Sequence, residues 1–247
     1  MNQQTEQYLV SIVTVTKNCV QTIARTLESI RAIKTPEIQY VVIDGESSDG
    51  TLDIIRSQGA LVDVLVSEKD GGVYQAMNKG AELASGRYVL FLNGDDQIVA
   101  DGFNRALDIL RAKHPRILSC RSSTCWLNEA DVEVLTPRPM LLLFFNAIPH
   151  LSTFICTPIQ RRFRYREDLR IASDYDMFLR LFIRGYHFTV SNLITAVHYR
   201  GDGISADRVQ SAIEIETVKR NNLGVFYFAI KFIEWLNQNR KRLCPAQ

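Results

Sequence analysis

Two adjacent carboxylates, Asp95 and Asp96, follow a run of five apolar residues, 88–92, that predicts a buried strand. Asn93 and Gly94 lie between and favour a turn at the carboxyl end of that strand, where open α/β sheets bind their ligands. Neighbouring carboxylates repel each other, so a positive charge is expected close to them. A Mg²⁺ or Mn²⁺ ion that carries a diphosphate meets this need, because such ions take oxygen ligands and share them with phosphates. The alternative is a polar turn that caps the next helix.

The elements that must position this turn alternate along the first half of the chain. The pattern predicts strands at residues 10–16, 39–43, 61–66 and 87–92, with helices at 19–33, 52–58 and 73–83 between them. Strands separated by helices of this size imply βαβ units. Later segments predict a helix at 103–113, a strand pair within 117–128 and a helix at 174–184 that stops at Gly185. We expect an α/β fold with a Rossmann-like, mostly parallel central sheet flanked by helices, and a smaller region packed on the same sheet.

The composition is that of an ordinary globular protein, with 46% hydrophobic and 23% charged residues. A net charge of +2 gives no reason to expect nucleic acid as a partner. Residues 1–7 lack the apolar core of a secretory signal, and the longest apolar run, 140–145, is too short to cross a bilayer. The five cysteines lack zinc-type pairing, so we expect reduced thiols and a cytoplasmic location.

A third acidic position, Asp44, follows the strand predicted at 39–43. Gly45 and two serines then allow a sharp turn, and a carboxylate at a strand end can bond a nucleotide base or ribose. The alternative is an Asx turn in which Asp49 caps the next helix. We favour the ligand role for Asp44 and the cap for Asp49. The chain has no G-x-G-x-x-G and no P-loop pattern, so neither a Rossmann dehydrogenase nor a P-loop NTPase is supported.

Four segments carry a resemblance to a known family. They are SIVTVTKN at residues 11–18, VIDG at 42–45, SEKDGGVYQAMNKG at 67–80 and FLNGDD at 91–96, in family order and spacing. Together they resemble a family-two inverting glycosyltransferase of the GT-A fold, in the bacterial subgroup that builds surface polysaccharides. The resemblance extends from residue 9 to about residue 205, and residues 74–80 are its most specific part.

The resemblance implies a role for individual positions. Residues expected around the nucleotide-sugar donor are Thr14, Thr16, Asp44, Asp70, Asn78, Lys79, Asn93 and Asp95. Asp96 is expected to hold the divalent metal, Mg²⁺ or Mn²⁺, and His198 is a further candidate ligand of the metal or phosphate. Asn93 stands where the family commonly has Asp, and a neutral Asn can still accept a hydrogen bond. Gln75 and Glu46 also depart from frequent family residues, which leaves the donor sugar open.

The second chemical centre is the acidic start of the helix predicted at 174–184. The family has an acidic pair here, and the resemblance makes Asp174 the expected catalytic base, with Asp176 as its backup because Ser173 replaces the first acidic residue. Displacement at an anomeric carbon needs a carboxylate that takes the proton of the incoming hydroxyl. A metal meanwhile stabilises the charge on the diphosphate leaving group. The alternative is that these carboxylates only complement the helix dipole.

Four further features complete the sequence-based expectations. His150 faces the acceptor or is a buried structural histidine, and the Gly-rich loop 200–205 is a candidate to close over the diphosphate. A basic run either is solvated or meets a phosphate-bearing acceptor; it contains Arg161, Arg162, Arg164, Arg166 and Arg170. The aromatic segment 226–243 ends in three cations, 240–242, and either lies on a membrane surface or packs on the core.

These observations together predict a metal-dependent, inverting glycosyltransferase. It would move a sugar from a nucleotide-diphosphate donor, UDP on family grounds, to a hydroxyl of a glycan or lipid-diphosphate-linked acceptor, in the cytoplasm or peripherally on the inner face of the plasma membrane. Residues 1–115 would bind the donor, 116–220 the acceptor, and 221–247 would form an amphipathic helix and basic tail. A glycoside hydrolase also needs two carboxylates but leaves the Asp44 loop unexplained. A catalytically silent nucleotide-sugar binding module stays open because of Asn93 and Ser173.

Overall fold

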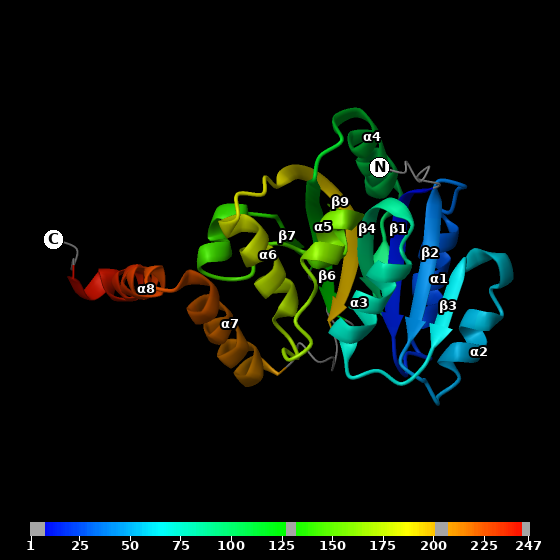
Figure 1. The fold of residues 1–247 in the computed structure, drawn as a ribbon, viewed down its shortest axis with the longest axis horizontal. Coiled ribbons are helices and arrows are strands. Elements are labelled where there is room, and N and C mark those ends of the chain that lie inside the picture. The colour runs from blue at the N-terminus through cyan, green and yellow to red at the C-terminus, as the bar shows by residue number, and fades with distance from the viewer. Residues whose placement is uncertain (1–7, 127–131, 201–206, 244–247) are drawn as a thin grey trace.

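A computed structural model describes residues 8–126, 132–200 and 207–243, with the side chains of 126, 200 and 236–243 left aside. The strands are β1 (Tyr8–Thr16), β2 (Ile38–Asp44), β3 (Val64–Ser67), β4 (Gly86–Asn93), β5 (Gln97–Ile98), β6 (Ile117–Trp126), β7 (Val132–Leu135), β8 (Thr153–Cys156) and β9 (Thr189–Arg200) (Figure 1). The helices are α1 (Ile23–Arg31), α2 (Thr51–Arg56), α3 (Val73–Leu83), α4 (Ala100–Lys113), α5 (Thr157–Arg162), α6 (Ser173–Ile183), α7 (Arg208–Leu223) and α8 (Phe226–Leu243). Three short 3₁₀ turns join them, η1 (Gly59–Leu61), η2 (Pro139–Leu143) and η3 (His150–Ser152).

All described strands belong to one sheet, in the order β3-β2-β1-β4-β8-β6-β9-β5, with β7 paired to β6. Strands β1, β2, β3 and β4 are parallel neighbours, and β6 is parallel to β9, whereas β8 and β5 run the opposite way. The predicted α/β fold with a mostly parallel sheet is therefore confirmed. The register pairs Thr16 with Asp44, Val15 with Asn93 and Asp44 with Ser67, so the carboxyl ends of four strands meet at one edge.

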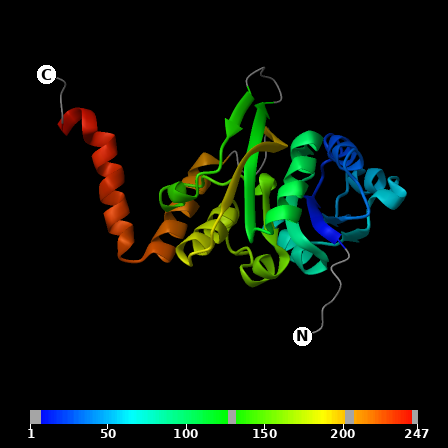
Figure 2. The same ribbon diagram turned by 90° about the horizontal axis from the view of Figure 1, so that it is seen from above.

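Both faces of the sheet are buried. Along β1, Val13 and Val15 belong to a core cluster shared with α3 and α6, while Val10 and Ile12 belong to a second cluster shared with α1 and α4. Helices on both faces explain why the central strands read as continuous apolar runs rather than alternating ones. The two layers of helices are best separated in Figure 2, where α8 extends from the molecule as an arm.

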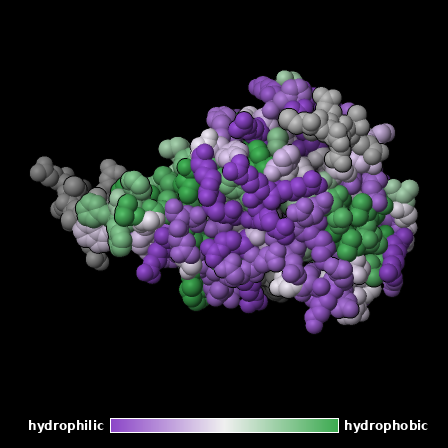
Figure 3. Space-filling model, in the orientation of Figure 1, coloured by the Kyte–Doolittle hydropathy of each residue, from purple (hydrophilic) through white to green (hydrophobic). Residues whose placement is uncertain are grey.

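The C-terminal helix α8 lies at one end of the molecule and contacts α7. Figure 3 shows hydrophobic side chains on the surface at this end. On α8, Phe228 and Phe232 are 74% and 59% exposed, and Trp235 is 50% exposed. None of the described helices combines the length and the hydrophobicity needed to cross a membrane.

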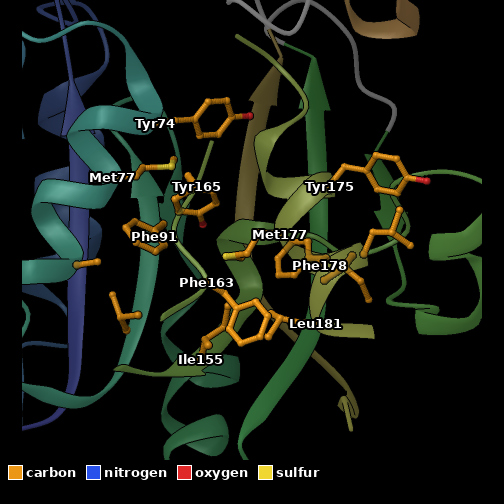
Figure 4. Packing of buried hydrophobic residues seen from close by; sticks show 14 of the residues in the cluster. Tyr74, Met77, Phe91, Ile155, Phe163, Tyr165, Tyr175, Met177, Phe178 and Leu181 are labelled. Carbon is orange, nitrogen blue, oxygen red and sulfur yellow. The ribbon is translucent and has the colours of Figure 1, made fainter. Parts of the chain in front are cut away.

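The segment before α6 packs on α3 and on the sheet through Tyr165, and α6 itself belongs to the same core cluster (Figure 4). The ring of Tyr165 stacks on Tyr74 of α3 at 5.4 Å between centroids and meets Phe91 of β4 edge-on at 5.3 Å. On α6 itself Phe178 is buried and packs against Phe188. The helix ends at Ile183, and Gly185 adopts a φ of 76°, as the sequence pattern predicted for a glycine stop. This packing sets where the first turn of α6 lies.

Some boundaries differ from the predicted ones. The helix predicted at 19–33 is shorter, and the strand predicted at 61–66 begins at Val64 because 59–61 form a 3₁₀ turn. The strand pair predicted within 117–128 is a single long strand, β6, whose antiparallel partner β7 comes later. Residues 127–128 of that prediction lie outside the described residues.

Candidate active site

The buried carboxylate of Asp96 is the centre of the strand edge. Its Oδ1 lies 2.9 Å from Nδ1 of His198 and accepts the backbone N–H of Tyr199 at 3.2 Å. Its Oδ2 accepts a hydrogen bond from Nδ2 of Asn93 at 3.0 Å. Asp96 is fully buried, whereas the His198 side chain is 22% exposed. The two residues predicted as metal ligands are thus brought together although 102 positions separate them.

The adjacent carboxylate of Asp96 makes the ionisation of Asp95 less favourable. Burial and the charge of Asp96 raise the pKa of Asp95 to about 6, while His198 and Arg25 act in the opposite direction. The guanidinium of Arg25 lies 4.4 Å from the centre of the Tyr199 ring, a cation–π contact. The expectation of positive charge near the pair is met in the protein by Arg25, which the sequence pattern did not single out.

Polar side chains connect this edge to the start of α6. The amide of Asn93 lies 3.5 Å from Nε2 of His150, and Nδ1 of His150 lies 3.7 Å from Oδ2 of Asp174. Asp174 is held from two further sides: Nδ2 of Asn146 donates to its Oδ2 at 2.9 Å, and the N–H of Tyr175 donates to its Oδ1 at 2.7 Å. A continuous polar path therefore joins Asp96 to Asp174, the two carboxylates predicted for metal binding and for base catalysis.

An asparagine at position 93 suits this path better than an aspartate would. Its amide nitrogen donates to Asp96 and faces the His150 ring, whereas a carboxylate at this position would add a third negative charge. Burial lowers the pKa of His150, although the charges of Asp174 and Asp96 act the other way. The imidazole is therefore held mainly neutral.

The ends of β1 and β2 contain two close approaches to glycine. A Cβ on Gly94 would lie 2.6 Å from Oγ1 of Thr16, and one on Gly45 would lie 2.7 Å from Oδ2 of Asp70. Asp44 is fully buried, and its carboxylate accepts hydrogen bonds from the hydroxyls of Ser47 and Ser67. Thr16, Asp44 and Asp70 therefore line the ends of β1, β2 and β3, next to the Asp95–Asp96 turn.

Comparison with known proteins supplies the family. The profile of a family described as Glycosyl transferase family 2 matches residues 11–130. An uncharacterized glycosyltransferase of Mycobacterium tuberculosis is 31% identical over 183 residues, which cover 69% of this chain and 68% of the relative. The chain belongs to glycosyl transferase family 2. TuaG of Bacillus subtilis, a glycosyltransferase named for teichuronic acid biosynthesis, is 32% identical over 105 residues, 41% of this chain and 42% of that protein.

Solved structures of family-like proteins share the fold. Residues 1–349 of S. aureus TarS, in complex with UDP-GlcNAc, match with a TM-score of 0.69 at 18% identity, over 86% of this chain and 67% of that one. The mannosyltransferase PcManGT from Pyrobaculum calidifontis, in complex with GDP-Man and Mn²⁺, matches with a TM-score of 0.63 at 18% identity, over 86% of this chain and 64% of that one. The predicted family, the GT-A fold and the enzyme class are thereby confirmed.

The residues of this family 2 glycosyltransferase fit a hard divalent cation beside Asp96. Asp96 and His198 adjoin, and Oδ1 of Asn93 is buried with no hydrogen-bond partner among the described residues. No group of three or more His, Cys, Asp or Glu side chains in the described part of the chain forms a cage for a metal. Mg²⁺ and its relatives are commonly held by one or two carboxylates plus substrate phosphates, so a small protein donor set suits them.

Several other positions predicted at the donor have partners elsewhere. Thr14 is fully buried, and its hydroxyl accepts a hydrogen bond from Tyr40 on the α1 side of the sheet. The Asn78 amide bonds the backbone of Tyr165 in both directions at 2.9 Å, and Lys79 pairs with Glu68. These contacts give Thr14, Asn78 and Lys79 structural roles, and a role at the donor stays a prediction for each of them.

The acidic pair on α6 is divided in the same way. Asp174 is 15% exposed, whereas Asp176 is 1% exposed. Both oxygens of Asp176 accept hydrogen bonds, from Nε of Arg180 at 2.6 Å and from Nδ2 of Asn222 at 2.9 Å. Asp176 ties α6 to α7, and the geometry therefore favours Asp174 over Asp176 as a base.

The basic run is mainly engaged in internal contacts. The guanidinium of Arg161 donates to the carbonyls of Ala81, Glu82 and Ala84, which closes the end of α3. Arg166 pairs with Asp168. A shallow hollow of about 570 Å³ lies over the remainder; it is lined by Arg162, Arg164, Tyr165, Arg166, Glu167, Asp168 and Arg180. The loop 201–205, expected to close over the diphosphate, lies outside the described residues.

Proposed function

We propose that this chain is a metal-dependent, inverting glycosyltransferase that takes its sugar from a nucleotide-diphosphate donor, with UDP as the nucleotide. The observation that carries the proposal is the polar path from Asp96 through Asn93 and His150 to Asp174. One of these carboxylates follows β4 at the carboxyl ends of the parallel strands, and the other lies at the start of α6. The binding of UDP-GlcNAc by TarS and of GDP-Man with Mn²⁺ by PcManGT supports the donor class.

In this mechanism residues 1–115 bind the donor and 116–220 present the acceptor. Thr16, Asp44 and Asp70 contact the nucleoside, and Asp95 contacts the ribose or the sugar. Asp96, His198 and the free oxygen of Asn93 would hold Mg²⁺ or Mn²⁺, which supplies positive charge for the leaving diphosphate.

Asp174 acts on the acceptor. Its carboxylate takes the proton of the acceptor hydroxyl while the oxygen bonds to the anomeric carbon, and the bond from that carbon to the nucleotide diphosphate breaks with its electron pair. Attack opposite the leaving group inverts the configuration. Asn146 and the Tyr175 N–H fix Asp174, and neutral His150 fills the space between it and Asn93 without adding a competing charge.

The direct test is thermal stability with UDP, GDP and their sugars, each with and without Mn²⁺. A ligand that binds only the native state raises the melting temperature. At a concentration 100 times its Kd, it stabilises the native state by about 2.7 kcal/mol. We expect a rise with UDP or one UDP-sugar that requires the metal, and then transfer or slow hydrolysis of that donor. If no nucleotide raises the melting temperature, the proposal is wrong. A metal-dependent rise without turnover would identify a silent binding module instead.

For the acceptor we propose a glycan or lipid-diphosphate-linked glycan used in surface polysaccharide synthesis, at the inner face of the membrane. The name of TuaG supports the pathway class. Helix α8 supports the location, because Phe228, Phe232 and Trp235 form an outward apolar strip while Tyr227 bonds Glu216 of α7. Three cations follow this strip at 240–242 and complement an anionic lipid surface.

We expect the protein to float with vesicles rich in phosphatidylglycerol and not with pure phosphatidylcholine vesicles. Replacing Phe228 and Trp235 by serine should lower the bound fraction at least about tenfold, because burial of each ring contributes on the order of 2 kcal/mol. Met140→Ser, at a residue 68% exposed elsewhere, is the matched control and should bind like the wild type. Equal flotation of the double variant would contradict the lipid contact, and a change of oligomeric state alone would point to a second copy as the occupant.

A further inference from the structure

A buried glutamate of α7 occupies the amino end of α6. Glu214 is 5% exposed, and its two carboxylate oxygens accept three successive backbone N–H groups, those of Arg170 at 3.0 Å, Ile171 at 2.8 Å and Ala172 at 2.9 Å. Nε2 of Gln210, one turn earlier on α7, donates to the same carboxylate at 2.9 Å. Three of the four hydrogen bonds that this carboxylate accepts thus hold one short segment, residues 170–172, and the fourth, from Gln210, fixes the carboxylate itself.

This segment enters directly into the first turn of α6. The residue at the N-cap is Ala172, whose methyl side chain can accept no hydrogen bond from the free N–H groups of the turn. Glu214 satisfies the N–H groups just before the helix from 42 or more positions away. Asp174 stands two residues after Ala172, so the direction in which its carboxylate points depends on how this segment is held.

Two further hydrogen bonds hold the start of α6. Both are made by hydroxyl groups, whereas Glu214 is charged. The Ser173 hydroxyl accepts the N–H of Arg166 at 2.6 Å, and the Tyr74 hydroxyl donates to the carbonyl of Ile171. The hydrogen bond from Arg166 also gives a structural role to the serine at position 173, where the family pattern has an acidic residue. Neither contact binds the N–H groups that Glu214 accepts.

We propose that Glu214 is a positioning residue for Asp174: it holds the start of α6 so that the Asp174 carboxylate meets the acceptor hydroxyl. The inference rests on the proposed function for its kinetic consequence, whereas the structural part rests on the contacts of Glu214 alone. A misplacement of a reacting group by about 1 Å can cost on the order of 100-fold in rate. The donor site, on β1, β2 and β4, makes no contact with Glu214 among the described residues and keeps its affinity.

The charge state of Glu214 supports this role. Burial by itself raises the pKa of this carboxyl, but the hydrogen bonds from Gln210 and from the three backbone N–H groups hold it below its ordinary value of 4.5. A carboxyl with a lowered pKa in the folded state stabilises the fold fully above the unfolded pKa and loses that contribution as the pH falls through the folded pKa. We call the Glu214 carboxylate and the three backbone N–H groups that it accepts the clamp. The carboxylate is therefore charged at neutral pH, and the contribution of the clamp to stability shrinks below about pH 4.5.

The test is Glu214→Gln in the full chain, with Glu216→Gln as the matched control. Glu216 lies on the same helix but bonds Tyr227 and Lys231 of α8. In Glu214→Gln an amide NH₂ faces backbone N–H groups, so we expect hydrogen exchange at residues 170–175 to accelerate at least tenfold. The kcat of transfer should fall on the order of 100-fold, with the donor KM and the metal-dependent rise in melting temperature unchanged. Glu216→Gln should change none of these.

Each outcome decides a separate point. Unchanged hydrogen exchange at 170–175 in Glu214→Gln overturns the clamp, whatever the activity. Accelerated exchange with an unchanged kcat overturns the positioning role and leaves the proposed function intact. If the wild type transfers no sugar, the proposed function fails while the exchange result still decides the clamp.

Discussion

Asp174→Asn is expected to lower the rate of sugar transfer about 10²- to 10⁴-fold, the usual contribution of a general base. The amide keeps the size of the side chain and can still accept the hydrogen bond from Tyr175 N–H at Oδ1. It cannot take a proton from the acceptor hydroxyl. Because the proposed donor contacts lie at the ends of β1, β2 and β4, the metal-dependent increase in melting temperature with UDP should be unchanged. Stopped-assay measurement of kcat and KM for the donor checks both parts.

The matched control is Asp176→Asn, two residues further on the same helix. Its carboxylate is buried between Arg180 and Asn222. This variant should therefore lower the free energy of unfolding by about 3 kcal/mol, because a buried charge is left unpaired. Its turnover per folded molecule should fall less than that of Asp174→Asn. The two variants thus separate chemistry from folding. Transfer by Asp174→Asn at more than a tenth of the wild-type rate would remove Asp174 from the role of base.

The parts of the fold that follow from local pattern were predictable from the sequence. Apolar runs separated by helical periodicity predicted β1, β2 and β4 and their parallel pairing, because both faces of these strands are covered and the runs are continuous. The same property limits what the sequence says about Thr14. In a strand buried on both faces, alternation does not tell which hydroxyl reaches a ligand, and only Thr16 stands at the strand end.

The site was predictable where its residues are adjacent in the sequence and not where folding brings them together. Asp95 and Asp96 follow a strand directly and could be recognised as a pair. Asn146 and Glu214 reach Asp174 and its helix from 28 and more than 40 positions away, and the sequence around them carries no signal of that contact. Arg25 lies on an ordinary amphipathic helix, where nothing distinguishes it from a surface cation.

Asp96→Asn is expected to abolish the metal-dependent response to the donor. The amide can still accept from Tyr199 N–H, so the fold around the turn is retained, but the negative charge that attracts a divalent ion is lost. The increase in melting temperature on adding UDP with Mn²⁺ should disappear, and transfer at saturating donor should fall on the order of 100-fold or more. Calorimetric titration of Mn²⁺ in the presence of UDP checks the binding step separately from the chemistry.

Asp101→Asn is the control for charge alone, because that carboxylate is 83% exposed at the start of α4 and faces Arg105. It should titrate Mn²⁺ and transfer sugar like the wild type. His198→Asn distinguishes a metal ligand from a hydrogen-bond partner of Asp96. A ligand role predicts weaker Mn²⁺ affinity, whereas a hydrogen-bonding role predicts unchanged affinity because the Asn amide, in the place of Nδ1, can still donate to Asp96. If Asp96→Asn binds UDP and Mn²⁺ as tightly as the wild type, the ion is held elsewhere, and the polar path from Asp96 to Asp174 loses its proposed function at the donor end.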